Sequence, residues 1–378
     1  MRKNTRLNED ETKMRTMLVG FITDGRHSGI DKYLLGFCAV AGEAGVKLDF
    51  LTQKADPELR ERLAGYGFGL IEAPSLKRPL RQYNAFKRVL REGGYDAVYL
   101  NLSEAFNCTL LSAAKACGVT CRVAHSHSSG VDRSNPVSRF VRRFLHKLFR
   151  PRLSRLATER IACSSVAGEW MFSRPYRIIR NAVDGGRFAF DPAAREEMRR
   201  ELDLSDRRAL IHVGNCCYQK NQEFLLDVMR ALLEKGEDAV LLLVGEGPSL
   251  PMLRARARSL GVADHVRFLG IRTDIPALLS AADVFVFPSR FEGFGIACAE
   301  AQFSGIPCVF SEAVPREVRV SEDVAFLKTD KPAVWADQIL RDYGPRKPAR
   351  LYSESRLYDA AENKKELLSI IRDEEERA

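Results

Sequence analysis

The chain alternates short apolar runs with helix-like segments, and this alternation restarts once, midway along its 378 residues. In the first half the apolar runs are TMLVGFI (16–22), LDFL (48–51), FGLI (68–71), DAVYLN (96–101) and VTCRVA (119–124). In the second half they are ALIHVG (209–214), AVLLLVG (239–245), HVRFLG (265–270), VFVFP (284–288) and PCVF (307–310). Strands without polar alternation, separated by helices such as 30–42, 80–91 and 104–117, are typical of parallel sheets covered on both faces. The pattern predicts an α/β protein with two consecutive doubly wound units.

This restart also predicts the domain organisation. We expect a polar leader over residues 1–15 and two Rossmann-like domains over residues 16–180 and 181–350. A C-terminal helix over residues 351–378 should then pack back toward the first domain. Doubly wound sheets bind ligands at the carboxyl ends of their strands, so two facing domains would hold a ligand in the cleft between them.

Features that would take the chain out of the cytoplasm are absent from the sequence. No run of about 18 apolar residues occurs, and the basic first residues lack the apolar centre of a secretory signal peptide. The nine cysteines include no C-x-x-C pair, which is typical of free interior thiols rather than a zinc site. We therefore expect a cytoplasmic protein.

The net charge of +9 is unevenly distributed. Residues 1–180 hold 31 Lys and Arg against 17 Asp and Glu, a net of +14, which leaves −5 for the remainder. A basic half suits an anionic substrate, an anionic membrane or nucleic acid. No nucleic-acid-binding motif with interleaved aromatic residues accompanies it, so we expect no nucleic-acid partner.

The segment FPSRFEGFGIACAEAQFSGIPCV (287–309) carries the strongest chemical signal. A loop with Gly293 and Gly295 follows a strand, and a helix begins near Ile296. Glycines let backbone N–H groups approach a ligand, and a helix start favours an anion such as a diphosphate. Glu300 lies about 6 Å further along the helix, where its carboxylate could accept hydrogen bonds from two ribose hydroxyls. Glu292 in the loop could meet a bound sugar, although both glutamates could also be merely solvated.

The spacing of Glu292 and Glu300 resembles the Glu-x7-Glu signature of retaining glycosyltransferases of family 4, and AQFSGIPCVFSE (301–312) resembles their exopolysaccharide and capsule branch. Further similar segments follow in the family's order: RVAHSHSSG (122–130), ACSSVAGEWMF (162–172), HVGNCCYQKNQEFLLD (212–227), LLLVGEGP (241–248) and FLGIRTDIPALLSAADVFVFPS (268–289). The resemblance implies the GT-B fold, in which two Rossmann-like domains face each other across a cleft. The N-terminal domain would bind the acceptor and the C-terminal domain the nucleotide-sugar.

Several donor-binding residues are implied by this resemblance. Lys220 would grip the diphosphate, Arg272 would lie where the nucleobase is held, and Glu300 would bind the ribose. The loop residues that would contact the donor are Glu292, Gly293, Phe294, Gly295 and Ile296. Asn215 stands where the family usually has an arginine. One cation is therefore missing, which would weaken the phosphate contact or shift it to another basic residue.

The catalytic candidates are Lys220, Glu292 and two histidines. His125 and His127 end a strand, and alternation places them on the same side of the chain, facing the cleft. The resemblance implies that His127, and after it His125, contacts the donor sugar or the reacting centre. The family also has a glycine-rich loop after the first strand. Here Gly25 and Gly29 flank that loop without the usual adjacent pair, and Gly29 is the candidate donor contact.

The sequence thus predicts retaining transfer from a nucleotide-diphosphate sugar, with UDP as the expected nucleotide, to a glycan or lipid-linked acceptor. We expect neither cofactor nor metal, because no Asp-x-Asp occurs. A Walker loop is absent and GEGPSL (245–250) is not a full G-x-G-x-x-G, which disfavours a kinase and a dinucleotide enzyme. Two alternatives remain: a UDP-sugar epimerase of similar build, and a non-catalytic sugar- or nucleotide-binding relative. The loss of a phosphate-binding cation at Asn215 is consistent with the second alternative.

The stretch SRFVRRFLHKLFRPRLSRLATER (138–160) has eight Lys and Arg and one acidic residue. Its apolar residues Phe140, Phe144, Leu145, Leu148 and Phe149 recur at near-helical spacing. This pattern is typical of a helix that lies on an anionic membrane surface, and it predicts peripheral binding to the inner face of the cell membrane. The alternative is that the apolar face packs on the N-terminal sheet.

Overall fold

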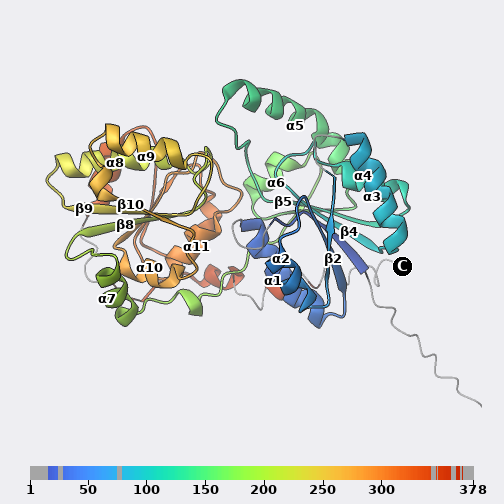
Figure 1. Cartoon of the computed structure of the whole chain (residues 1–378), viewed down its shortest axis with the longest axis horizontal. Helices are drawn as coiled ribbons and strands as arrows, with labels where there is room; N and C mark the ends of the chain where they lie inside the picture. The colour runs from blue at the N-terminus through green and yellow to red at the C-terminus, as the bar shows by residue number, and fades with distance from the viewer. Residues whose placement is uncertain are drawn as a thin grey trace, which may run out of the picture.

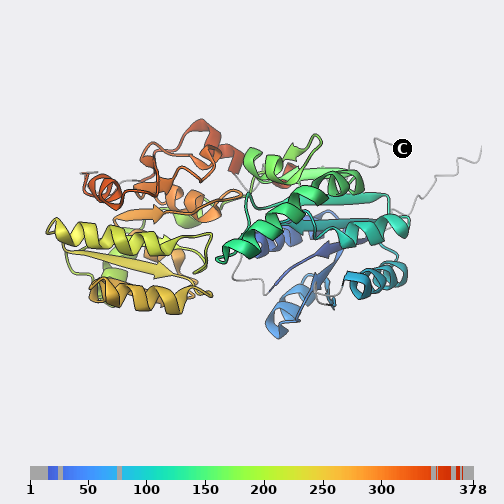
Figure 2. The ribbon, with the colours of Figure 1, turned by 90° about the horizontal axis from the view of Figure 1, so that it is seen from above.

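The computed structural model describes residues 16–23, 29–74, 79–341, 346, 348–358, 363–366 and 368. Within these residues the chain forms two parallel sheets side by side, each with helices on both faces (Figures 1 and 2). The predicted class, two doubly wound α/β units in sequence, is confirmed.

The first sheet has the strand order β3-β2-β1-β4-β5-β6-β7. Its strands are β1 (Thr16–Gly20), β2 (Lys47–Thr52), β3 (Gly69–Glu72), β4 (Ala97–Leu102), β5 (Cys121–Ser126), β6 (Glu159–Ala162) and β7 (Arg177–Ile178). The helices that accompany it are α1 (Gly29–Glu43), α2 (Pro57–Ala64), α3 (Pro79–Gly93), α4 (Thr109–Ala116), α5 (Pro136–Leu156) and α6 (Ser165–Met171). We call this unit the N-terminal domain.

The second sheet repeats the same winding, with the order β10-β9-β8-β11-β12-β13. Its strands are β8 (Arg208–Val213), β9 (Ala239–Val244), β10 (Val266–Gly270), β11 (Val284–Phe287), β12 (Cys308–Ser311) and β13 (Val324–Leu327). Its helices are α7 (Pro192–Glu201), α8 (Gln222–Glu234), α9 (Leu250–Ser259), α10 (Ile275–Ala281), α11 (Ile296–Phe303) and α12 (Pro332–Ile339). This unit is the C-terminal domain, and the predicted division at residues 180 and 181 falls between the two sheets.

Burial explains why the apolar runs form these strands. Every residue of β4, β9, β11 and β12 is buried, as expected for strands that have helices on both faces. In both sheets the strand order reverses next to the first strand, between β1 and β4 and between β8 and β11. The loops that leave these neighbouring strands in opposite directions open the crevice where doubly wound sheets bind ligands.

The structure differs from the sequence prediction in the short elements. Strands β6, β7 and β13 were not predicted, because runs of two to four residues have too little periodicity to be recognised without their sheet partners. The helix expected from residue 104 begins only at Thr109. Glu104 instead forms an ion pair with Arg142 of α5.

The end of the chain crosses back to the N-terminal domain. Residues Ser353–Tyr358 form a 3-10 helix, not the start of the predicted α-helix, and residues 363–366 are helical again. Asn363 donates to the carbonyl of Arg180, and Lys364 pairs with Glu43 of α1. The predicted leader, residues 1–15, and the last ten residues of the predicted C-terminal helix, 369–378, lie outside the described residues.

Candidate active site

The loops after β8 and β11 bring a lysine and a glutamate together at the carboxyl edge of the C-terminal sheet. The ammonium of Lys220 donates to Glu292 Oε1 at 2.8 Å and lies 4.6 Å from the ring centre of Phe287. Burial opposes the charged form of Lys220, but the charge and hydrogen bond of Glu292 outweigh it and raise the pKa of Lys220 above its usual range. Lys220 is therefore protonated, and its ion pair with Glu292 lies at the point where the strand order of the sheet reverses.

The loop from Glu292 to Gly295 ends at the start of α11, where the sequence predicted an anion site. Gly295 precedes the helix with a φ of +89°, a left-handed conformation that glycine adopts without strain. Because the residue before the helix is a glycine, it offers no side-chain acceptor to the first N–H groups of α11. Such a helix start suits a diphosphate.

Glu300 lies one turn into α11 and is 5% exposed. Its Oε1 accepts from the ammonium of Lys32, at 2.9 Å, and its Oε2 is buried without a hydrogen-bond partner. Lys32 belongs to α1 of the N-terminal domain and was not predicted as a site residue. One signal was available: a lysine in the first turn of a helix opposes the helix dipole, which indicates a partner elsewhere.

The Glu292–Gly295 loop lies directly against the N-terminal domain. A Cβ on Gly293 would stand 2.0 Å from the carbonyl oxygen of His127, so only glycine fits at this contact. The hydroxyl of Ser129 donates to the carbonyl of Glu292 at 2.6 Å, and that of Ser164 donates to the carbonyl of Gly293. Hydrogen bonds between the domains thus fix the position of this loop beside the end of β5.

His127 follows β5 in a network of polar groups. Its Nε2 lies 2.8 Å from Asn101 Oδ1, and the amide nitrogen of Asn101 donates to the carbonyl of Gly20. Since the amide oxygen of Asn101 can only accept, we assign the proton of His127 to Nε2. Burial lowers the pKa of His127 to about 3, so the imidazole is neutral at pH 7 and Nδ1 keeps its lone pair.

His125 lies on the same side as His127, as predicted, and their ring centres are 3.9 Å apart. Its side chain has no exposed surface, because it lies within the sheet and is covered by Tyr33 of α1. Its Nδ1 and the Tyr99 hydroxyl are 2.7 Å apart, and the hydroxyls of Tyr99 and Tyr33 are also 2.7 Å apart. The prediction that His125 faces the cleft is therefore wrong. His125 is buried, and its ring packs against the ring of His127.

The other predicted residues divide into those near this centre and those turned away. The Cβ position of Gly29 lies 3.6 Å from the side chain of Ile296, which brings the starts of α1 and α11 together. The ring of Phe294 is buried and stacks on Tyr358, so the predicted donor contact of Phe294 would be made by its backbone. Gly25 lies outside the described residues.

Asn215 and Arg272 form their hydrogen bonds and ion pairs with residues other than Glu292 and Glu300. Asn215 is exposed in the loop after β8, and its carbonyl accepts from Gln222. The guanidinium of Arg272 pairs with Asp274 and Glu201, at 2.5 and 3.2 Å. A nucleobase contact through this side chain would require these ion pairs to open, and it stays a prediction.

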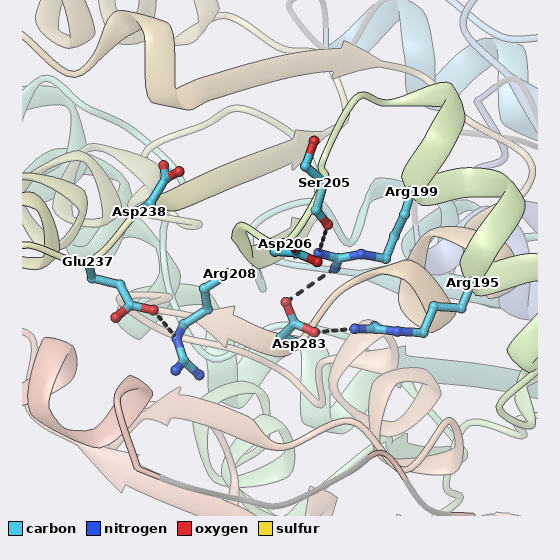
Figure 3. Close-up of a pocket in the computed structure, with 8 residues that line it drawn as sticks. All are labelled: Arg195, Arg199, Ser205, Asp206, Arg208, Glu237, Asp238 and Asp283. Carbon is cyan, nitrogen blue, oxygen red and sulfur yellow. Dashed lines mark hydrogen bonds and ion pairs between the residues drawn. The ribbon is translucent and has the colours of Figure 1, made fainter.

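A pocket of about 460 Å³ lies elsewhere, at the amino edge of the C-terminal sheet (Figure 3). Arg208 begins β8 there and Asp283 precedes β11, so the pocket and the Lys220–Glu292 pair lie at opposite edges of the sheet. Figure 3 shows Arg195 and Arg199 directed at Asp283, and Arg208 directed at Glu237. Its three arginines are already paired with Asp283 or Glu237, which makes it a structural network and not the site of chemistry.

The described residues contain neither a metal-binding cluster nor a membrane-spanning helix. Among them, no group of three or more His, Cys, Asp and Glu side chains is placed to hold a metal ion. In the same part of the chain, no helix is both long and apolar enough to cross a membrane. All nine cysteines are free thiols.

Comparisons with known proteins agree with this geometry. Residues 27–187 match the family model described as Glycosyltransferase Family 4, and residues 207–343 match the one described as Glycosyl transferases group 1. EpsF of Bacillus subtilis, assigned as a glycosyltransferase, is 28% identical over 96% of this chain and 97% of its own. A GDP-mannose-dependent alpha-(1-6)-phosphatidylinositol monomannoside mannosyltransferase of Mycolicibacterium smegmatis is 30% identical over 75% of this chain and 77% of its own.

Solved structures show the same fold. HepE of Anabaena, in complex with UDP-glucose, superposes with a TM-score of 0.72 at 19% identity, over 95% of this chain and 100% of its own. Sucrose-phosphate synthase of Thermosynechococcus elongatus gives a TM-score of 0.77 at 19% identity, over 97% of this chain and all of its own. With both halves matched by family models and a relative at 30% identity, the chain belongs to glycosyltransferase family 4 and is a glycosyltransferase with the GT-B fold.

Proposed function

We propose that this glycosyltransferase transfers a sugar from a UDP-sugar to a glycan or lipid-linked glycan, with retention of the anomeric configuration, in exopolysaccharide or capsule synthesis. One observation carries the donor site: Lys220, Glu292 and Glu300 gather around the start of α11 at the switch point of the C-terminal sheet. The buried, unpartnered Oε2 of Glu300 supports a ligand that brings hydrogen-bond donors, as ribose hydroxyls do.

The choice of UDP is supported by some relatives and opposed by others. The structure of HepE contains UDP-glucose, and an Escherichia coli relative, 28% identical over 63% of this chain, is a UDP-Gal-dependent galactosyltransferase. The mycobacterial relative instead uses GDP-mannose. Binding of UDP-, GDP- and ADP-sugars, measured side by side, tests the nucleotide; tighter binding of a GDP-sugar would overturn our choice.

The proposed chemistry needs charge stabilisation on the leaving diphosphate. The acceptor hydroxyl oxygen forms a bond to C1 of the sugar, on the face from which the diphosphate leaves. The C1–O bond breaks with its electron pair going to the diphosphate oxygen, which then takes the proton of the acceptor hydroxyl. Lys220 and the start of α11 would stabilise this oxygen, an electrostatic contribution that commonly dominates such catalysis.

Substitutions of the two glutamates test the site. Glu300→Ala should weaken UDP binding by about 1.5–3 kcal/mol, because a charged acceptor of the ribose is lost. Glu292→Ala should mainly lower turnover, with a smaller loss of UDP affinity. Parent-like binding and turnover in both variants would contradict the assignment.

Metal independence is also a proposal, motivated by the absence of Asp-x-Asp and by the cation and helix start at the diphosphate position. Transfer should therefore survive a chelator. Complete loss of activity in EDTA, restored by manganese or magnesium, would contradict it.

The alternatives are less well supported. Membership of a glycosyltransferase family favours a transferase over a UDP-sugar epimerase or a non-catalytic binding protein. Product analysis with donor alone separates them from a transferase. An epimerase would interconvert donor sugars without acceptor, and a non-catalytic protein would bind the donor and leave it intact.

We further propose that the enzyme is cytoplasmic and docks through α5 on the anionic inner face of the cell membrane, where a lipid-linked acceptor would be reached. The apolar stripe Val137, Phe140, Val141, Phe144 and Leu148 is 48–73% exposed. The helix instead buries His146, Leu153 and Ser154 against the N-terminal domain. Of the apolar residues predicted from the sequence, Phe140, Phe144 and Leu148 are exposed, so the packing alternative is wrong for these three, whereas Phe149 is partly buried against the core.

The charge around this stripe selects the partner. Helix α5 has seven Lys and Arg and no acidic residue, and Arg143, Lys147, Arg152 and Arg155 are exposed. A second copy of the same basic helix would be repelled, whereas an anionic lipid surface would be attracted. Only a short loop separates His127 from the start of α5, and Arg139 of α5 stacks on Tyr218 of the C-terminal domain. One end of α5 lies toward the C-terminal domain (Figure 1), so docking through α5 would bring the bilayer near the boundary between the domains.

A further inference from the structure

Among the residues that the structure describes, Lys32 is a charged contact of the N-terminal domain with the candidate donor site. Its ammonium reaches Glu300 Oε1 at 2.9 Å, across the boundary between the domains. The two partners differ in exposure: the side chain of Lys32 is 45% exposed, whereas that of Glu300 is 7% exposed. Lys32 therefore has room to move, and Glu300 does not.

The pair is incomplete as a structural ion pair. Glu300 Oε2 is buried and accepts no hydrogen bond, which costs stability in the absence of a ligand. Two vicinal hydroxyls could donate to both carboxylate oxygens of Glu300 and would then replace Lys32 at Oε1. This step rests on the proposed function, in which Glu300 binds the ribose.

The charges around the site need a second cation when the donor arrives. The formal charges of the two lysines and the two glutamates at the site cancel: Lys220, Lys32, Glu292 and Glu300. Lys220 is already paired with Glu292. Asn215, exposed in the loop after β8, is neutral. A nucleoside diphosphate brings at least two negative charges into this largely buried cluster, and such charges must be paired.

Lys32 is positioned to supply that cation. It follows Gly29 by three residues, about one helical turn, and the Cβ position of Gly29 lies 3.6 Å from Ile296, the first residue of α11. Glu300 lies about one turn further along α11, roughly 6 Å from its start, which is within the reach of a lysine side chain. The same ammonium can therefore address Glu300 in the free enzyme and an anion at the start of α11 in the complex.

We propose that Lys32 is a donor-binding residue that leaves Glu300 when a nucleoside diphosphate binds and pairs with the diphosphate, as the second cation beside Lys220. In the free enzyme it holds Glu300 in place. In the complex it links the N-terminal domain to the donor and fills the role that Asn215 cannot.

Binding of UDP and uridine to the full-length enzyme tests this assignment. Lys32→Met should weaken UDP binding about tenfold or more, the effect of one charge-assisted hydrogen bond, and should leave uridine binding unchanged or tighter because Glu300 is released. Adding Asn215→Arg to Lys32→Met should restore most of the UDP affinity. Lys115→Met removes an exposed lysine of α4 as the matched control and should bind both ligands like the parent.

Two results would overturn the assignment. If Lys32→Met changed UDP and uridine affinity by the same factor, Lys32 would serve only as a structural ion pair that joins the domains. The same conclusion would follow if Lys32→Met bound UDP like the parent. Failure of the parent itself to bind UDP or another nucleoside diphosphate would instead contradict the proposed function. Melting temperatures of all variants show whether an affinity loss comes from unfolding.

Discussion

At Gly293 the backbone of the C-terminal domain lies directly against that of the N-terminal domain. A methyl group there would meet the carbonyl oxygen of His127 at 2.0 Å and its carbonyl carbon at 2.4 Å. Both are backbone atoms, which cannot move aside as a side chain can. The contact therefore requires glycine for steric reasons, and it holds Glu292 next to the end of β5.

Gly293→Ala should separate the loop from His127 and lower kcat/KM at least tenfold, since a misplacement of about 1 Å can cost two orders of magnitude. Each domain should stay folded, because the substitution lies in the loop between β11 and α11, at the contact between the domains. Gly36→Ala is the control: it adds a methyl group in the middle of α1 where no atom lies within 4 Å. Steady-state kinetics with circular dichroism measures both effects, and parent-like turnover of Gly293→Ala would show that the contact is dispensable.

At the same scale, the sequence predicted the residues that share one segment and missed those that meet only in three dimensions. Glu292 and Glu300 were recognisable because their spacing reflects one loop and one helix. Lys32 lies far from this segment in the chain and reaches Glu300 only because the two domains face each other. Tyr33 and Asn101 are distant in sequence from His127 and meet it only through the fold of the N-terminal domain. His125 was placed on the correct side of β5, but strand alternation does not reveal that Tyr33 covers it.

At the scale of elements, buried strands were predictable and exposure was not. Fully buried strands such as β4 and β9 need continuous apolar runs, which are visible in any sequence of this class. The periodicity of α5 predicted an apolar stripe but could not say whether it faces the sheet or solvent. That outcome depends on which residues of α5 the neighbouring segments contact, here Arg142 with Glu104 in the loop after β4 and His146 with Trp170 of α6.

The exposed stripe of α5 leads to a prediction about membranes. The protein should cosediment with liposomes containing anionic lipid, and binding should fall as salt rises, because each exposed basic residue adds about 1 kcal/mol near an anionic surface. Arg143→Glu with Lys147→Glu should abolish binding. Arg142 is left intact because it pairs with Glu104 and its loss would disturb the packing of α5.

The matched control for this experiment is Arg200→Glu with Arg258→Glu, which makes the same charge change at exposed positions of α7 and α9. It should bind liposomes more strongly than the α5 variant. Phe140→Ser with Phe144→Ser should weaken binding at high salt, where burial of apolar surface remains the main attraction. Equal binding of the parent to neutral and anionic liposomes at low salt would contradict the proposal.

For the whole molecule, the repeated pattern predicted two domains of the same winding, but not how they meet. Each domain's winding follows from local patterns and from the right-handed crossover between parallel strands. The contact between domains depends instead on single features, such as Gly293 against His127 and the carboxylate of Glu317, which accepts from the backbone N–H of Ser165. Such contacts leave no periodic signal.

Stability toward acid is a property of the whole molecule, because buried neutral histidines lie in both domains. Burial lowers the pKa of His146 to about 4 and that of His212 to about 3. Each already has two partners that suit the neutral ring: His146 accepts from the N–H of Ala105 and donates to the carbonyl of Trp170. The carbonyl of Val286 accepts from Nδ1 of His212, and Gln222 lies 3.2 Å from Nε2.

The folded protein therefore resists protonation at these histidines, whereas the unfolded chain takes up protons near pH 6.5. Their stabilising contribution is complete above pH 6.5 and is lost progressively as the pH falls toward 4 or 3, by about 1.4 kcal/mol per pH unit for each. Calorimetric unfolding should show a melting temperature that falls from pH 7 to pH 5, before most carboxylates titrate. His212→Asn should be less stable at pH 7 but lose less stability between pH 7 and pH 5 than the parent. Melting temperatures that stay constant over this range would contradict the account, since a folded state that bound these protons as readily as the unfolded chain would show no such dependence.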